Sequence, residues 1–486
     1  MSDDMWTVSA SSSGFADAGE WRSGVEEAVP IDYALVGRIQ SEVNRALDER
    51  ARTASTAFSP AEQRQLAGQL VSEYLESQML SSAEEGLELL DAVQERALRD
   101  AVLAQMFGLG RLEQLLLETE VEDIRIPGSG PVLVKLASGK REIRDPVAES
   151  VSDLMAQLDA IATHHGQNAR SVTSARPWLD LRLPGQHRLA GVWEITPKPY
   201  VTIRRHRYVD IKLDDLVEMG ELSPAMAAFL NAAVIARRSI LVVGGQSSGK
   251  TTLLRALCQC LPPTESFATL ETEYELLLHE ISPDRFPWLI PYEAREGMGE
   301  IGLDGRPAGE VTLADIFPTS LRHSLDRMVV GEVRGPEVTS LLSAMSRGYK
   351  GSMGTFHADS AEGAVTALAT LLSEFKTNWS YAASIFQIAE AVDLIVYIDK
   401  EPTRSGADIR YISHIIEITS VAENGQATVN PIFEPLEGRA EVDPRGYAAN
   451  QPGDPRWGRR AGLDPAWLEP EHSLWPKEFP ERAGWA

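Results

Sequence analysis

A glycine-rich stretch at the centre of the chain constrains its fold more than any other feature. Residues 244–252 read GGQSSGKTT and directly follow the apolar run SILVV. The spacing Gly244-x-x-x-x-Gly249-Lys250-Thr251 is that of a phosphate-binding loop, where glycines let consecutive backbone N–H groups turn toward an anion. The helical segment TTLLRALCQCL follows and presents the positive end of its dipole to the same place. The sequence therefore predicts a buried strand, a phosphate loop and a helix, in that order.

The residue types in and after this loop predict how a nucleotide is held. We expect Mg-ATP as the ligand, with Lys250 reaching the β- and γ-phosphates and the Thr251 hydroxyl binding Mg²⁺. A later segment, DRMVVGEVRGPE, predicts a short strand over Met328–Val330 with Glu332 just past its end. A carboxylate there can hold Mg²⁺ or polarise an attacking water. The other loop residues expected to contact the nucleotide are Gly244, Gly245, Gln246, Ser247, Ser248, Gly249 and Thr252.

The 486 residues are too many for one typical domain. Helical periodicity followed by short strands predicts an α/β N-terminal domain with a helical lead over residues 31–205. Short apolar strands then alternate with helices from 223 to 434, which is typical of a mostly parallel sheet covered by helices. We expect residues 1–30 to be disordered and residues 206–222 to form a linker. The Pro- and Trp-rich tail over 435–486 is expected to be disordered, or else to dock on a partner or on the chain's own surface.

The charge and apolar pattern exclude several classes of protein. With 71 acidic and 46 basic residues the formal net charge is −25, which argues against a stable nucleic-acid partner, since Lys and Arg supply that affinity. No apolar stretch is long enough to span a bilayer, and the N-terminus lacks the features of a secretory signal. Cys258 and Cys260 lie too close together for a disulfide framework. We therefore expect a cytoplasmic chain with no transmembrane segment.

Taken in order, GGQSSGKTTLLRAL, RMVVGEVRG and GSMGTFHADSA resemble the type II/type IV secretion ATPase superfamily. Within it the sequence is most similar to the CpaF/TadA branch, the motors of tight-adherence pilus assembly. The resemblance covers about residues 105–420. It implies a RecA-like P-loop ATPase domain after a smaller N-terminal domain, and a homo-hexameric ring. It also implies an inner-membrane assembly platform as partner, with the ATPase peripheral at the inner face of the cell membrane.

The resemblance also assigns roles to carboxylates and a histidine. Lys250 and Thr251 match the Walker A pair, and Glu332 matches the Walker B glutamate. The segment LETEYEL resembles the family's acidic box, with Thr272 in place of its aspartate, a loss for which Glu273 could compensate. Glu275 would order the attacking water, and Glu271 would support it and help to hold Mg²⁺. His357 matches the histidine box, where it would bond near the γ-phosphate and report hydrolysis to a neighbouring subunit. Tyr349 replaces an earlier histidine of many relatives.

Arginines complete the site that the resemblance implies. The segments LDLRLPGQHRLAGV and VTIRRH are similar to N-terminal segments that lie over the nucleotide in this family. Their guanidinium groups could neutralise developing phosphate charge in cis or across a subunit interface. Adjacent arginines on a strand point to opposite faces, so both members of the last pair would not serve one phosphate. The candidates are Arg182, Arg188, Arg204 and Arg205, with Arg334 as a weaker one.

These features predict an ATPase motor that hydrolyses Mg-ATP to drive pilus assembly or protein secretion through a membrane platform. Two alternatives stay open. A DNA-translocating motor of the conjugation type would need basic pore loops, which a hexameric ring could carry despite the acidic total. A non-hydrolysing nucleotide-binding scaffold is the other alternative, and Thr272 in the acidic box is its main support.

Overall fold

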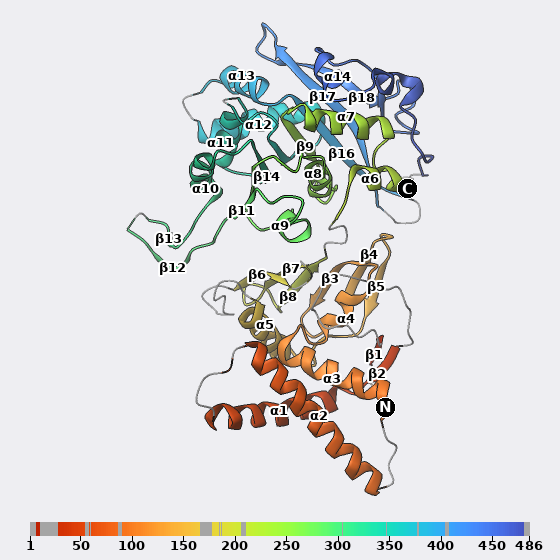
Figure 1. Cartoon of the computed structure of the whole chain (residues 1–486), viewed down its shortest axis with the longest axis vertical. Coiled ribbons are helices and arrows are strands. Elements are labelled where there is room, and N and C mark those ends of the chain that lie inside the picture. The colour runs from red at the N-terminus through yellow and green to blue at the C-terminus, as the bar shows by residue number, and fades with distance from the viewer. Residues whose placement is uncertain are drawn as a thin grey trace. The chain divides into compact units, whose positions relative to one another are not determined.

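The computed structural model of the chain divides into two compact units, Met1–Arg207 and Tyr208–Ala486 (Figure 1). It describes residues 6–9 and 28–480, apart from positions 54–57, 59, 86–89, 166–176, 184, 186, 206–209, 304, 347, 377–378 and 404–407. The segment expected to be disordered, residues 1–30, lies largely outside the described residues. Each unit buries its own apolar clusters.

The first unit combines a group of helices with a small sheet. Helices α1 to α3 pack on one another around a shared apolar cluster, and the N-cap Asp91 starts α3 with a capping box. The helices are α1 (Tyr33–Thr53), α2 (Pro60–Glu85), α3 (Ala92–Phe107), α4 (Leu112–Leu117) and α5 (Val151–His165). The strands are β1 (Trp6–Ser9), β2 (Ala28–Ile31), β3 (Val121–Pro127), β4 (Val132–Leu136), β5 (Arg141–Arg144), β6 (Trp178–Leu183), β7 (His187–Val192) and β8 (Tyr200–Arg204). This architecture agrees with the α/β N-terminal domain with a helical lead that the sequence predicts.

The six-stranded sheet of this unit is antiparallel, in the order β5-β4-β3-β8-β7-β6. Alternate residues of β6 to β8 are buried, so one face packs on the apolar cluster that includes α5, and the other face is more open. Arg182 lies opposite Arg188, and Arg188 lies opposite Arg204. Because opposed residues of an antiparallel sheet share a face, these three arginines form one row across the open face.

The second unit carries the phosphate loop. Its helices are α6 (Leu213–Met219), α7 (Pro224–Ile235), α8 (Lys250–Gln259), α9 (Leu278–Ile281), α10 (Leu313–Ser320), α11 (Glu337–Ser346), α12 (Ala361–Phe375), α13 (Tyr381–Ala391) and α14 (Arg456–Arg460). Its strands are β9 (Ile240–Gly244), β10 (Phe267–Glu271), β11 (Leu289–Glu293), β12 (Met298–Ile301), β13 (Pro307–Ala308), β14 (Arg327–Val333), β15 (Met353–His357), β16 (Leu394–Pro402), β17 (Asp408–Val421), β18 (Ala427–Pro435) and β19 (Gly446–Ala448). Within the part of the chain that the structure describes, no helix combines the length and the apolar content needed to cross a bilayer.

The central sheet of the second unit has nine strands in the order β11-β10-β14-β15-β9-β16-β17-β18-β19. The strands from β11 to β16 pair in parallel, and β17 to β19 extend the sheet antiparallel. Successive residues of β9 enter different apolar clusters: Ile240 and Val242 join the one with α7 and α8, and Leu241 and Val243 join the one with α11 to α13. A strand buried on both faces reads as a continuous apolar run, which explains SILVV. The predicted α/β fold with a RecA-like domain is confirmed.

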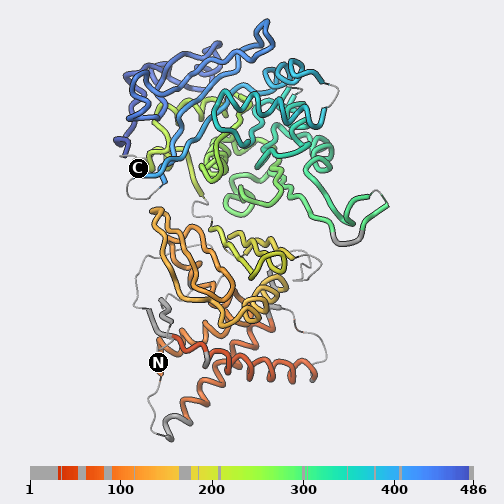
Figure 2. Tube along the Cα trace, turned by 180° about the vertical axis from the view of Figure 1, so that it is seen from behind, coloured from red at the N-terminus to blue at the C-terminus, as the bar shows by residue number. Residues whose placement is uncertain are grey.

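The C-terminal segment corrects the expectation of a disordered tail. Residues 436–480 are described and pack on the second unit, with the blue C-terminal segment lying against the yellow-green one that contains α7 (Figure 2). Trp457 is 9% exposed and stacks edge-on against Phe229 of α7, with ring centroids 5.5 Å apart. The Trp475 indole N–H donates to the carbonyl of Gly446 at 2.9 Å. Apolar burial of widely spaced tryptophans holds this segment on the chain's own surface, which was one of the expected alternatives.

The predicted linker over 206–222 is also shorter than expected. Positions 206–209 lie outside the described residues, whereas α6 belongs to the second unit and packs against α7. Leu213 and Leu216 of α6 and the preceding Ile211 are all at most 5% exposed within the core of that unit. Their burial makes residues 211–222 a structural part of the P-loop domain.

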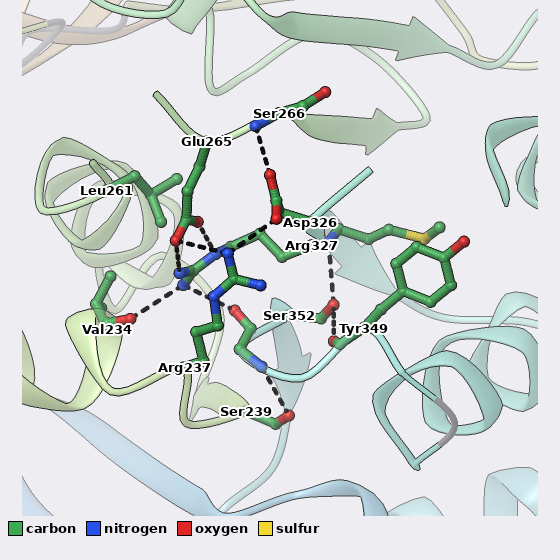
Figure 3. Close-up of polar contacts among 12 residues, drawn as sticks. Val234, Arg237, Ser239, Leu261, Glu265, Ser266, Asp326, Arg327, Tyr349 and Ser352 are labelled. Atoms are coloured by element: carbon green, nitrogen blue, oxygen red, sulfur yellow. Dashed lines mark hydrogen bonds and ion pairs between the residues drawn. The ribbon is translucent and has the colours of Figure 1, made fainter. Parts of the chain in front are cut away.

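A buried ionic cluster lies at the amino-terminal ends of the parallel strands (Figure 3). The guanidinium of Arg327, the first residue of β14, is fully buried and pairs with both carboxylate oxygens of Glu265, at 2.5 and 2.8 Å. It also donates to the Val234 carbonyl at the end of α7, at 3.1 Å. Arg237 joins Glu265 to Asp326, at 3.2 and 2.9 Å. The cluster therefore joins the start of β14 to the end of α7 and to the segment before β10.

Candidate nucleotide site

The phosphate loop connects β9 to α8, and its backbone has positive φ angles at three positions, two of which are glycines. Gly244 and Gly249 have φ angles of 155° and 103°, and Ser247 has 59°. A Cβ on Gly244 would lie 2.3 Å from the carbonyl oxygen of Ile398 in β16, so no larger residue fits there. α8 begins at Lys250, immediately after the loop, so its free N–H groups and positive dipole end face the same place.

Lys250, His357 and Glu332 form a chain of close polar contacts at the carboxyl ends of β9, β15 and β14. The Lys250 ammonium lies 3.3 Å from His357 Nδ1, and His357 Nε2 lies 2.6 Å from a Glu332 oxygen. Burial, and then the charge of Lys250, lowers the pKa of His357 and favours the neutral ring. A neutral ring in this position accepts at Nδ1 from Lys250 and donates from Nε2 to Glu332. A proton or charge change at one member is therefore felt by the other two.

The Lys250 amine also contacts the phosphate loop itself. It donates to the carbonyls of Gly244 and Gly245, at 3.1 and 2.7 Å, and is 7% exposed. Burial lowers the pKa of Lys250 to about 8, with the charge of Glu332 acting in the opposite direction. The amine is therefore held at the loop by weak neutral acceptors, which a phosphate oxygen would outcompete as a hydrogen-bond acceptor.

Glu332 lies inside β14, whereas the sequence predicts it just past the strand's end. The pairing of β14 with β15 shifts register between Val330 and Val333, which is an irregularity that re-aims a side chain out of the strand's regular alternation. The second carboxylate oxygen of Glu332 pairs with Arg334 at 2.5 Å. The Arg334 side chain is 72% exposed, so this pair adds little energy but places a cation beside the site.

The acidic segment after β10 presents Glu275 to the first turn of α8. The Thr251 hydroxyl donates to a Glu275 carboxylate oxygen at 3.1 Å. Glu271 is 2% exposed and accepts from the backbone N–H groups of Glu275 and Leu276, each at 2.8 Å. Burial raises the pKa of Glu271 to about 7. Glu271 thus holds the turn that carries Glu275, while Thr272 between them is exposed.

Arg255, which none of the sequence motifs includes as a site residue, supports this turn from α8. Arg255 is 2% exposed and donates from Nε to the carbonyl of Leu276 at 3.1 Å, and from its guanidinium to the carbonyl of Glu275. Burial lowers its pKa, with Glu271 opposing that shift. The signal that could have found it is a single arginine within the apolar helix TTLLRALCQCL, because a buried charge needs partners.

The described residues fit a nucleotide phosphate with Mg²⁺. The Ser248 hydroxyl is buried in the loop and has no hydrogen-bond partner among the described residues, so the loop leaves a polar atom for a ligand to satisfy. Thr251 and Glu275 place a hydroxyl and a carboxylate together, which are oxygen ligands that Mg²⁺ accepts. In the described part of the chain, no cluster of three or more His, Cys, Asp or Glu could hold a metal by itself. A Mg²⁺ ion here would depend on phosphate oxygens as further ligands.

The remaining arginine candidates belong to the first unit. Arg204 pairs with Asp123 at 3.2 Å, and Arg205 contacts the carbonyl of Glu118, all within the first unit. The row of three arginines also belongs to that unit, so its contact with a nucleotide remains a proposal. Tyr349 lies just before β15, at the end of the strand opposite to His357, and its hydroxyl donates to the Leu321 carbonyl at 3.2 Å. Tyr349, which replaces the earlier histidine of many relatives, therefore makes a hydrogen bond to the backbone of Leu321.

The protein has a RecA-like α/β domain with a phosphate loop, preceded by a smaller α/β domain. The family model described as "Type II/IV secretion system protein" matches residues 108–403, and the chain belongs to that family. The chain is similar to a Mycobacterium tuberculosis protein named for conjugal transfer, with 33% identity over 306 residues, covering 61% of this chain and 82% of the relative.

Two further proteins are similar to the chain. The conjugal transfer protein TrbB of Rhizobium radiobacter is 30% identical over 245 residues, covering 49% of this chain and 68% of TrbB. Among solved structures, the VirB11 ATPase of the Brucella suis type IV secretion system is 24% identical and covers 63% of this chain and 92% of its own. Its TM-score is 0.33.

Proposed function

We propose that this protein is an ATPase motor that hydrolyses Mg-ATP to drive pilus assembly or protein secretion through a membrane platform. The observation that carries the proposal is the meeting of Lys250, Thr251, Glu275, Glu332 and His357 at the carboxyl ends of four strands. This is the edge at which open α/β sheets bind their ligands. Membership of the Type II/IV secretion system protein family supports the same function.

The chemistry follows from the positions of these side chains. Bound Mg-ATP supplies the phosphoanhydride bond and the divalent charge. Lys250 would exchange its loop carbonyls for phosphate oxygens, and the Thr251 hydroxyl would be a ligand of the metal ion. Glu275 or Glu332 then accepts a hydrogen bond from the attacking water and orients it. His357 lies between Lys250 and Glu332, so it senses the loss of charge when the γ-phosphate departs.

The finer assignment is to the CpaF/TadA branch, with a homo-hexameric ring peripheral at the inner face of the cell membrane. The order of the motifs supports this branch, and the arginine row offers groups that a neighbouring subunit's nucleotide could use. In such a ring, loss of phosphate would release these contacts and let the subunits move against one another, pushing on a membrane-embedded partner.

The test is steady-state ATPase activity of the full chain with sizing, with and without nucleotide. We expect Lys250→Ala and Glu332→Gln each to lower kcat by roughly a hundredfold or more, because each removes a group that acts on the reacting phosphate or water. Glu362→Gln, an exposed carboxylate at the start of α12, is the matched control and keeps wild-type turnover. Wild-type turnover that is unaffected by Lys250→Ala would refute the site.

The same assay separates two other functions. A DNA-translocating motor is favoured by the relatives named for conjugal transfer. It predicts hydrolysis that DNA stimulates and that salt suppresses steeply, against the expectation from a net charge of −25. A scaffold that binds without hydrolysing is favoured by Thr272 in the acidic box. It predicts ATP binding with no measurable turnover of the wild type.

A further inference from the structure

The outer side of the phosphate loop is packed against a part of the sheet that no site motif includes. Beyond the end of β9, the strands β16 and β17 continue as a two-stranded extension in which Lys400 faces Arg410. Arg410 donates from Nε to the carbonyl of Ser247 at 3.3 Å. Its Cδ lies 3.4 Å from the place that a Cβ on Gly249 would occupy. Arg410 therefore lies against the back of the loop, beyond residue 403, where the family match ends.

The contact with Ser247 bears on the phosphate-binding side of the loop. Ser247 has a φ of 59°, which is uncommon for a residue with a side chain. The C=O of Ser247 and the N–H of Ser248 belong to one planar peptide unit and point in opposite directions. A donor that holds the carbonyl outward therefore keeps the Ser248 N–H directed to the other side, where a nest of N–H groups would meet a phosphate.

Glu221 places a buried carboxyl group beside Arg410 behind the loop. It follows α6, and its backbone carbonyl accepts from Ile412 N–H of β17 at 2.9 Å. Its carboxylate reaches to 4.0 Å from the Cβ position of Gly249, on the same side as Arg410. Burial raises the pKa of Glu221 to about 7, and the charge of Arg410 opposes that shift. The carboxyl of Glu221 and the side chain of Arg410 therefore lie beside each other next to Gly249, near enough for the charge of Arg410 to act on Glu221.

We propose that Arg410 is a positioning residue for the phosphate loop, fixing the Ser247–Ser248 peptide from behind, with Glu221 beside it. The proposal rests on the proposed function in one respect, that residues 244–252 bind nucleotide phosphates. Arg410 acts through the loop backbone and touches no substrate. Its effect is on how well the loop is formed before the nucleotide arrives, which is a contribution to binding more than to the chemical step.

The experiment measures MgADP binding by calorimetry and ATPase kinetics on the full-length protein. Arg410→Met removes the donor and keeps the apolar stem, and we expect roughly tenfold weaker MgADP binding, as for the loss of one charge-assisted hydrogen bond. KM for ATP rises by a similar factor while kcat stays within about threefold, because the loop is used equally by substrate and transition state. Arg410→Lys can still donate to the Ser247 carbonyl and recovers part of the loss.

The matched control is Tyr411→Phe, on the other face of the same strand. The Tyr411 hydroxyl donates to Glu401 at 2.7 Å, and its ring stacks on Phe479 at 5.3 Å, away from the loop. This variant removes a side-chain hydrogen bond from the next residue of β17 and should bind MgADP as the wild type does. Equal losses in Arg410→Met and Tyr411→Phe, or no loss in Arg410→Met, would overturn the proposal.

Lys250→Ala distinguishes a failure of this inference from a failure of the proposed function. If Lys250→Ala abolishes MgADP binding and Arg410→Met leaves it unchanged, the site stands and the role of Arg410 is refuted. If Lys250→Ala has no effect on MgADP binding, the phosphate site itself is refuted, and the role of Arg410 is refuted with it. If Arg410→Lys recovers nothing, the loss in Arg410→Met is not due to the hydrogen bond and the proposal is again refuted.

Discussion

Replacing Arg327 by methionine tests whether the ionic cluster at the amino ends of the strands stabilises the P-loop domain. Methionine is apolar and of comparable length, so it fills much of the volume that the arginine leaves. The substitution removes the pair with Glu265 and the donors to the carbonyls of Val234 and Gly351 (Figure 3). Among the described residues, the Glu265 side chain, which is 9% exposed, then pairs with the half-exposed Arg237 alone, at 3.2 Å. Its carboxylate is left with one partner where it had two.

The magnitude follows from these contacts. Breaking a buried ion pair by removing one partner costs about 3–5 kcal/mol, and the remaining Arg237 places this case near the lower end, at about 3 kcal/mol. The carbonyls that lose their donor add about 1 kcal/mol between them, since other backbone groups and water satisfy part of the need. We expect Arg327→Met to lower the free energy of unfolding of the second unit by about 4 kcal/mol.

Hydrogen exchange of the β14 backbone in the full-length protein measures this loss for the second unit alone. A change of about 4 kcal/mol corresponds to roughly a thousandfold faster exchange. Lys400→Met is the control, because Lys400 and Asp408 are 4.0 Å apart and partly exposed, and removing that pair costs about 1 kcal/mol or less. The double variant Glu265→Met/Arg327→Met should regain most of the loss, since no buried charge then lacks its partner. Less than tenfold faster exchange in Arg327→Met, or a double variant no more stable than the single one, would refute the reasoning.

Three further outcomes are expected. Gly244→Ala abolishes nucleotide binding, because its Cβ would meet the Ile398 carbonyl at 2.3 Å, whereas Gly245→Ala, with no atom within 4 Å of its Cβ position, keeps it; calorimetry with MgADP compares the two. Glu221→Gln is expected to become more stable than the wild type as pH rises. Burial raises the pKa of Glu221 from 4.5 to about 7, so between these two pH values the native state holds a proton that the unfolded state releases. The stability of the wild type therefore falls as pH rises through that window, whereas glutamine does not titrate. Urea unfolding should show little advantage at pH 4.5 and up to about 3 kcal/mol at pH 8, and a constant difference would contradict the titration. Trp457→Ala lowers the free energy of unfolding by about 3–5 kcal/mol in the same assay, and an unchanged midpoint would mean that the C-terminal segment does not pack on α7.

Much of the nucleotide site could be predicted because its parts are local motifs. The strand, loop and helix around Lys250 are contiguous in sequence. Residue spacing alone therefore predicts how the loop turns and where the following helix begins. Glu332 could be named because it comes soon after a short apolar run, and His357 because its segment resembles the family's histidine box. Their mutual contact could not be predicted, because it depends on β15 lying between β14 and β9 in the sheet. Only that order places His357 between Lys250 and Glu332.

The errors have a common physical origin. The tail was expected to be disordered because its prolines and glycines break every period, yet Trp457 is buried by packing against Phe229, more than 200 residues earlier in the chain. The residues assigned to the linker contain α6, whose short apolar face becomes part of a core only when α7 lies beside it. In both cases the residues that bury the segment are distant in sequence, so local composition does not predict the contact.

The sequence by itself therefore determined the class of fold, the phosphate loop and the residue types of the site, because these depend on short-range backbone geometry and on the period of buried residues. The tertiary structure alone decided which of these residues meet. It formed the Lys250–His357–Glu332 chain, and it made Glu271 a support for the turn that carries Glu275. It also placed Arg410 behind the loop. The physical reason is that strand order and long-range packing set the distances between side chains that lie far apart along the chain.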